Sequence, residues 1–230
     1  MKRIVIVASF LAIICTAFRQ EHPKKLLLLG DSISMQYSPF LEKMIKGSYA
    51  IIRKQDDGEG MQNLDIPKGS NIGNSRMALS YIRYKLADER FKPDLLTLNC
   101  GLHDIKRDTA TGVIAIDSAE YRKNLKEIVS IVQKRKIPMI WIRSTEVVDS
   151  IHRKNKAFTR LATDLVKYNA IADDVFRNAK VNIIDLYTFT KSMGGSRFVD
   201  HVHYNDETKA LQAAYIAGFL QDWRADKTGQ

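Results

Sequence analysis

The sequence predicts an α/β fold of three layers, in which helices cover both faces of a central parallel sheet of about five strands. Short apolar runs, typical of strands buried on both faces, alternate along the chain with longer segments of helical periodicity. This strand–helix–strand order gives parallel strands joined by right-handed crossovers. The expected strands are residues 25–29, 49–53, 95–99, 139–143 and 182–185.

The helical segments complete the alternation. In the fourth of them, Phe158, Leu161 and Leu165 recur three and four residues apart and form one apolar face. The least regular stretch, residues 55–70, is rich in Gly, Asp and Asn and is expected to be a surface loop. No internal repeat interrupts the pattern, so a single domain is expected. The predicted helices are residues 39–45, 75–87, 119–135, 156–178 and 206–224.

The composition is that of a globular protein. Of 230 residues, 45% are hydrophobic and 27% are charged, which excludes a disordered or fibrous chain. Two cysteines, Cys15 and Cys100, do not make a disulfide framework. The net charge of +10 comes from scattered lysines and arginines, without an aromatic-interleaved basic stripe. We therefore expect a solvated basic surface and no nucleic-acid partner.

The N-terminus indicates export. Lys2 and Arg3 precede an uncharged apolar run that ends at Ala17, the pattern of a secretory signal peptide and too short for a comfortable membrane span. We expect residues 1–17 to be removed, leaving a domain of residues 18–230 in the periplasm or outside the cell. Lipidation at Cys15, as in a lipoprotein, would instead tie the protein to a membrane. An uncleaved N-terminal anchor is the other alternative.

Polar residues cluster where predicted strands end, and ligands bind at the carboxyl ends of strands in open parallel sheets. Singly these segments are weak evidence, because Gly-Asp-Ser is a common turn and a lone serine more often caps a helix. Together they indicate one site at one rim of the sheet. The segments are Gly30-Asp31-Ser32, Asn71-Ile72-Gly73-Asn74-Ser75, Gly101-Leu102-His103-Asp104 and Asp200-His201-Val202-His203.

These segments resemble the sequence blocks of the SGNH (GDSL-type) hydrolases. Ser32 stands in the Gly-Asp-Ser of the first block, Gly73 matches the glycine of the second, and Asp200 and His203 match the Asp-x-x-His of the last. The third block is Gly-x-Asn-Asp in the family, and here His103 replaces the oxyanion-hole asparagine. The resemblance covers nearly the whole domain and implies a flavodoxin-like fold and ester hydrolysis without a metal or other cofactor.

The chemistry of these residue types agrees with the resemblance. Acyl transfer needs a hydroxyl, a base and a carboxylate that fixes the tautomer of the base, which Ser32, His203 and Asp200 supply. The backbone N–H groups of Ser32 and Gly73 are the expected oxyanion donors. His103 is the third, since a neutral imidazole has one N–H to donate. We further expect Asp31, Asn74 and His201 to contact the substrate.

Three other classes compete with this interpretation. An α/β-hydrolase is disfavoured, because the second glycine of the Gly-x-Ser-x-Gly elbow is absent after Ser32. A metal-dependent hydrolase could use the His and Asp residues of the last two segments, but it leaves Ser32 and Gly73 without a role. A catalytically silent glycan-binding module would bind its ligand without ester turnover.

We therefore expect an exported serine esterase that acts on small acyl esters. The resemblance favours an acetyl group on a small-molecule or polysaccharide substrate. A lysophospholipase or thioesterase acting on lipid esters is the second choice, and the sequence contains no long apolar lid that would cover an acyl chain.

Overall fold

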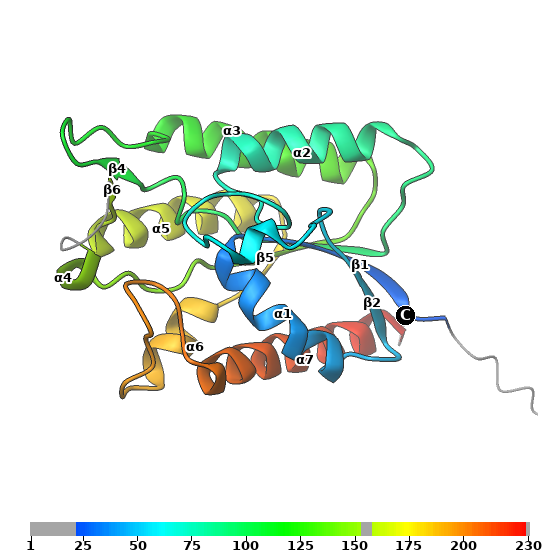
Figure 1. The fold of residues 1–230 in the computed structure, drawn as a ribbon. Coiled ribbons are helices and arrows are strands. Elements are labelled where there is room, and N and C mark those ends of the chain that lie inside the picture. Colours follow the sequence, from blue (N-terminus) through cyan, green and yellow to red (C-terminus); the bar gives the residue numbers. More distant parts are fainter. Residues whose placement is uncertain (1–21, 153–157, 229–230) are drawn as a thin grey trace, which may run out of the picture.

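A five-stranded parallel sheet forms the centre of the molecule (Figure 1). The computed structural model describes residues 22–152 and 158–228. The strand order is β2-β1-β3-β5-β7, and every neighbouring pair is parallel, which confirms the predicted fold class. The strands are β1 (Lys24–Leu29), β2 (Tyr49–Ile52), β3 (Leu95–Leu98), β5 (Met139–Ile142) and β7 (Asn182–Ile184).

The central strands are apolar apart from Thr97 of β3, because helices cover both faces of the sheet. All residues of β3 and β5 are buried. One face carries α1 (Ser32–Met44) and α7 (Asp206–Thr228), which pack on each other, with α6 (Leu186–Ser192) against α7 (Figure 1). The opposite face carries α2 (Ser75–Ala87), α3 (Ser118–Lys134) and α5 (Ala162–Asn178).

Helix α1 begins at Ser32, about two turns before the predicted start at Pro39. The carboxylate of Asp31 caps the helix by accepting the N–H of Ile33 at 3.0 Å. Pro39, where the prediction began, lies inside the helix and lacks the N–H that would bond to the carbonyl of Met35. The Ser38 hydroxyl donates to that carbonyl at 3.0 Å and replaces the missing bond.

Helix α5 begins at Ala162, later than predicted, because the chain before it is extended. Phe158–Thr159 form a strand, β6, that pairs antiparallel with β4 (Arg107–Asp108). The Ala162 N–H donates to the carboxylate of Asp149, in the short helix α4 (Asp149–His152), at 2.7 Å.

The predicted loop at 55–70 contains a short 3₁₀ helix, η1 (Glu59–Met61). Residues 153–157 lie outside the described part of the chain.

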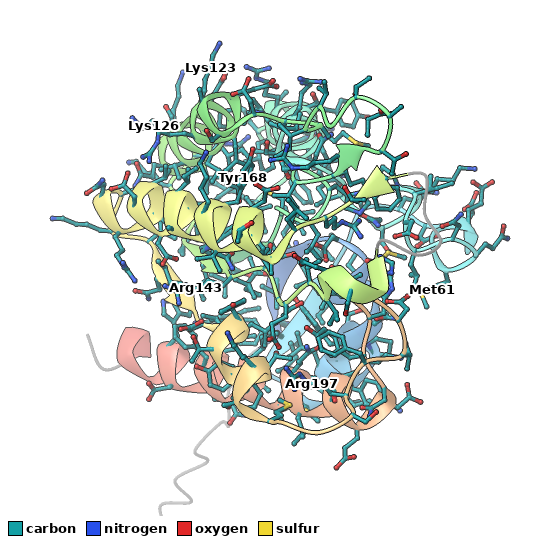
Figure 2. The ribbon with its side chains drawn as sticks, turned by 90° about the vertical axis from the view of Figure 1, so that its left-hand side faces the viewer. Met61, Lys123, Lys126, Arg143, Tyr168 and Arg197 are labelled. Atoms are coloured by element: carbon teal, nitrogen blue, oxygen red, sulfur yellow. The ribbon has the colours of Figure 1, made fainter. Side chains whose placement is uncertain are left out.

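The outer surface of the helical layer carries solvated lysines. Figure 2 shows Lys123 extending away from the molecule, and both Lys123 and Lys126 are exposed. Tyr168, by contrast, lies between α5 and α3, where its hydroxyl donates to the carbonyl of Ile116 (Figure 2).

The predicted signal peptide falls outside the described residues. Within the described residues, no helix has the length and apolar character needed to cross a membrane.

Candidate active site

Ser32, His203 and Asp200 form a hydrogen-bonded chain at the carboxyl rim of the sheet. The Ser32 Oγ lies 2.9 Å from the His203 Nε2, and the His203 Nδ1 lies 2.6 Å from the Asp200 Oδ2. Ser32 is the first residue of α1, two residues beyond Gly30, which follows the end of β1, and His203 precedes α7 by three residues. The packing of α1 against α7 therefore brings together two residues 171 positions apart.

The loop that carries the acid and the base is shaped by the acid itself. The Asp200 Oδ1 accepts the backbone N–H groups of Val202 at 2.9 Å and His203 at 2.8 Å, which turns the other oxygen toward the imidazole. Partial burial opposes ionisation, but hydrogen bonds from the His203 ring and from these N–H groups hold the pKa of Asp200 well below its usual range. Asp200 is therefore a carboxylate at neutral pH.

An ionised Asp200 fixes the tautomer of its partner. A carboxylate only accepts hydrogen bonds, so the His203 Nδ1 must carry the proton. The His203 Nε2 then accepts from the hydroxyl of Ser32. This is the geometry in which an imidazole removes the proton from an attacking serine.

The N-terminus of α1 supplies one donor for a developing oxyanion. Ser32 is the first helical residue, so its N–H has no acceptor within the helix, and the helix dipole favours negative charge there. Asp31 binds the N–H of Ile33, the next residue.

The second predicted backbone donor has an internal acceptor, which corrects the sequence prediction. The Gly73 N–H donates to the Asn71 Oδ1 at 3.0 Å, the bond of an Asx turn. Gly73 has a φ of +75°, and a Cβ there would lie 2.6 Å from the sulfur of Met77, so only glycine fits. As the structure stands, this N–H is not free for an oxyanion.

The side chain of Asn71 also orients His103. Because the Asn71 Oδ1 accepts the Gly73 N–H, the amide Nδ2 faces the His103 Nε2 at 3.4 Å. The ring nitrogen must then accept, which leaves the proton of His103 on Nδ1. Burial, together with nearby cations, lowers the pKa of His103 well below its usual value, so the ring is neutral and Nδ1–H is its one donor.

Asp104 connects the third segment to the second. Its two carboxylate oxygens lie 2.9 and 3.0 Å from the backbone N of Ser75, at the start of α2. Burial raises the pKa of Asp104 to about 7. The side chain is fully buried and holds the loop of His103 against α2.

The three predicted substrate contacts have structural partners. Asp31 is fully buried as the cap of α1, and His201 is buried with its Nε2 3.1 Å from the Arg160 Nη1. Both side chains are held by partners within the protein, and because Ser32 and His203 are equally buried, their contact with a substrate stays a prediction. Asn74 caps α2 by accepting the N–H of Met77 at 3.0 Å. Asn74 is partly exposed, so its contact with a substrate stays a prediction.

Two charged residues at the site were not predicted. Arg160 lies within a segment predicted to be helical, and Asp65 lies in the predicted surface loop. In the structure, the Arg160 Nη1 lies 3.6 Å from the Asp65 Oδ1, and both side chains are largely buried. No spacing in the sequence indicates this pair, since the two residues are 95 positions apart and belong to irregular segments.

The His and Asp residues do not form a metal cluster. Across residues 22–152 and 158–228, no group of three or more His, Cys, Asp or Glu side chains has the arrangement of a metal site. His203 is turned to Ser32, and His201 faces the guanidinium of Arg160, which would repel a cation. The geometry favours the serine mechanism over the metal-dependent alternative.

A serine, an imidazole and a carboxylate linked in this order define a serine hydrolase site. The model of the GDSL-like lipase/acylhydrolase family matches residues 28–211. The chain belongs to this family, and is thus a carboxylic ester hydrolase of the SGNH type, as its motifs predict.

Solved structures share the fold at low sequence identity. A lipase/acylhydrolase from Enterococcus faecalis is 19% identical, with a TM-score of 0.66 over 86% of this chain and 96% of that one. The acetyl xylan esterase AlAXEase is 19% identical, with a TM-score of 0.60 over 84% and 97%. Axe2, an acetylxylan esterase from Geobacillus stearothermophilus, is 14% identical, with a TM-score of 0.63 over 86% and 94%. A search of curated proteins finds no match.

Proposed function

We propose that this protein is an exported serine esterase that removes small acyl groups, in particular acetyl groups, from a carbohydrate. The observation that carries the proposal is the hydrogen-bonded chain from Asp200 through His203 to Ser32. These two hydrogen bonds let the imidazole of His203 activate the Ser32 hydroxyl as a nucleophile, a mechanism that requires no cofactor.

The reaction begins with acylation of the serine. Ser32 Oγ attacks the carbonyl carbon of the ester while His203 Nε2 takes the hydroxyl proton, and the charge of Asp200 stabilises the resulting imidazolium. The N–H of Ser32 and the Nδ1–H of His103 donate to the oxyanion. Collapse of the tetrahedral intermediate breaks the ester bond, and the imidazolium returns the proton to the departing alcohol.

Deacylation repeats these steps with water. His203 Nε2 removes a proton from a water molecule, which attacks the acyl carbon bound to Ser32. The second tetrahedral intermediate uses the same donors. Its collapse releases a carboxylic acid and returns the proton to the Ser32 oxygen, so the enzyme is restored.

The acetyl-carbohydrate substrate is supported by similarity in fold. Two of the similar structures are named as acetyl xylan esterases. At 14% and 19% identity this similarity concerns the fold, and it makes an acetylated polysaccharide the first substrate to test.

A lipid or thioester substrate is the second candidate because of one groove. A hollow of about 420 Å³ begins one turn along α1 from Ser32, at Met35 and Gln36. Phe40, Pro39 and Met61 add further apolar surface to it, and the charged residues Arg53, Asp56, Asp206 and Lys209 complete its lining. An acyl chain longer than acetyl could lie there.

Turnover of a substrate panel tests the proposal. The panel contains short acetyl esters, acetylated xylan and esters of longer acyl chains, measured with the parent protein, Ser32→Ala and the control Ser38→Ala. Ser38 is a buried serine of the same helix whose hydroxyl binds the Met35 carbonyl. We expect acetyl esters to be preferred, Ser38→Ala to be active and Ser32→Ala to be inactive. A preference for long acyl chains would select the lipid alternative.

Export is tested separately. Lys2, Arg3 and the apolar run up to Ala17 predict cleavage after Ala17. N-terminal sequencing of the protein from the periplasm or medium should begin at Phe18. Soluble cytoplasmic protein that keeps Met1 would contradict export, and a lipid on Cys15 would change only the anchoring.

A further inference from the structure

A buried cation, Arg160, lies beside the triad and has no part in the mechanism above. Its side chain is 2% exposed. The Nε donates to the carbonyl of Leu102 at 2.6 Å, while Nη1 lies 3.1 Å from the His201 Nε2 and 3.6 Å from the Asp65 Oδ1. One guanidinium therefore contacts three separate segments of the chain.

Two of these segments carry residues of the catalytic site. Leu102 immediately precedes His103, and His201 immediately follows Asp200. The third, with Asp65, belongs to the loop of residues 55–70. A guanidinium is planar and presents its donors in a fixed fork, so it holds its partners at set directions. The ring of Phe158 lies 4.8 Å from the Arg160 Cζ and adds a cation–π contact.

The contact with Arg160 fixes the tautomer of His201. A guanidinium only donates hydrogen bonds, so the His201 Nε2 accepts and a neutral ring carries its proton on Nδ1. This Nδ1 lies 3.6 Å from the Asp200 Oδ1, the oxygen that does not contact the His203 ring. The Val148 N–H holds the His201 carbonyl at 2.9 Å. The Nδ1 edge of His201 thus faces the triad carboxylate at a separation longer than a hydrogen bond, where a buried N–H still attracts a negative charge.

We propose that Arg160 is a positioning residue of the esterase site, acting through His201 on Asp200 and through the Leu102 carbonyl on the segment of His103. This inference rests on the proposed serine mechanism. Arg160 sets the place of the acid and of an oxyanion donor without touching the substrate itself.

The chemistry of burial supports a positioning role over a purely stabilising one. A buried ion pair seldom stabilises a fold more than apolar side chains of similar size, because both charges lose their hydration. Burial lowers the pKa of Arg160 to about 10, and the charges of Asp65, Asp31 and Asp200 oppose that shift. The group stays cationic at neutral pH, so its donors remain in place.

A lysine substitution tests the role of the fork, because lysine keeps the charge but does not reach two separated acceptors with fixed geometry. Arg107→Lys is the matched control. Arg107 makes a two-point contact with Asp164 at 2.7 and 2.9 Å on β4, the strand paired with β6. We expect Arg160→Lys to lower kcat by about 10²-fold with KM little changed, and Arg107→Lys to leave both unchanged. Equal kcat values for the two variants would overturn the proposal.

Substitutions of His201 test the same route without removing a buried charge. Asparagine places an amide N–H close to the Nδ1 position of histidine, and leucine places none. We expect His201→Asn to lower kcat about tenfold, because it keeps a donor toward Asp200 but loses the contact with Arg160, and His201→Leu to lower kcat further, with both melting close to the parent by circular dichroism. If His201→Asn kept the parent kcat, Arg160 would not act through His201, and if both variants lost the same share of kcat, His201 would not act on Asp200; either result would overturn the proposal. This pair decides the matter if Arg160→Lys does not fold.

Failure of this inference is distinct from failure of the proposed function. If Ser32→Ala turned over esters at the parent rate, the serine mechanism would be wrong. If Ser32→Ala were inactive while Arg160→Lys matched Arg107→Lys, the serine mechanism would stand and only the positioning role would fall.

Discussion

The two halves of the active-site rim differ in how they are assembled. On the triad side, Asp200 and His203 are three residues apart, and the bonds that orient them come from their own loop. On the oxyanion side, Gly73 and His103 depend on the side chain of Asn71, which binds one and faces the other. The triad is therefore a local structure joined to a helix N-terminus, whereas the oxyanion side relies on a contact between segments.

Changing the base or the acid of the triad should lower kcat most, because either change removes the proton transfer from Ser32. His203→Ala leaves the Ser32 hydroxyl without an acceptor for its proton, and Asp200→Asn favours the wrong tautomer of His203. We expect each to lower kcat by roughly 10⁴-fold with the fold intact. Steady-state kinetics on a short acetyl ester, with circular dichroism as the folding control, measures this. A loss under tenfold in His203→Ala would remove it as the base.

Truncation of His103 should lower kcat less, because it removes one of two oxyanion donors and leaves the triad intact. We expect His103→Ala to lower kcat by about 10² to 10³, or roughly 2.7 to 4 kcal/mol of transition-state stabilisation, with little change in KM. His103→Asn should recover part of the loss, since it restores an amide donor. If His103→Ala changed KM alone, His103 would be a substrate contact and the Ser32 N–H would be the remaining oxyanion donor of this account.

The buried acid of the oxyanion side should affect stability rather than chemistry. The pKa of Asp104 is raised to about 7, so the folded state holds this proton more tightly than the unfolded state. The stabilisation is complete below about pH 4 and is lost as pH rises to about 7, by at most about 1.4 kcal/mol per pH unit. Urea unfolding across this range should show a smaller pH slope for Asp104→Asn. An unchanged slope would contradict the raised pKa.

Breaking a surface ion pair far from the rim should have the smallest effect on unfolding free energy and kcat. Arg76 on α2 makes a two-point contact with Glu120 on α3 at 2.7 and 2.8 Å, and its side chain is 59% exposed. Because solvent screens such pairs, Arg76→Ala should cost under about 1 kcal/mol of unfolding free energy and leave kcat unchanged. Urea unfolding at two salt concentrations tests this. A larger cost would indicate that the helical layer contributes to the geometry of the site.

Local patterns in the sequence predict the sheet and the triad. The five apolar runs are the five strands of the sheet, and the spacing of Asp200 and His203 gives a hydrogen-bonded pair. A short polar residue at a helix start can either cap the helix or contact a substrate, and the sequence does not distinguish these roles. In the structure, Asp31 caps α1. The predicted start of α1 is wrong because a proline usually stands in the first turn of a helix, whereas α1 continues through Pro39.

Contacts between distant segments account for what the sequence does not predict. Arg160 directly follows β6, whose pairing with β4 places it beside Leu102, Asp65 and His201, and a two-residue strand has no distinct periodicity in the sequence. The contact of Asn71 with His103 is likewise between segments 32 positions apart. Neither contact follows from a repeat or a spacing in the sequence, whereas the Asx turn that occupies the Gly73 N–H is local.

Covalent labelling tests most directly the central claim, that His203 activates Ser32 as a nucleophile. The protein would be treated with a fluorophosphonate and digested, and the modified peptide would be identified by mass spectrometry. We predict one label, on Ser32, in the parent and in Ser38→Ala, and a much slower reaction in His203→Ala. No label should form in Ser32→Ala. A label on another serine, or labelling at the parent rate in His203→Ala, would contradict the account.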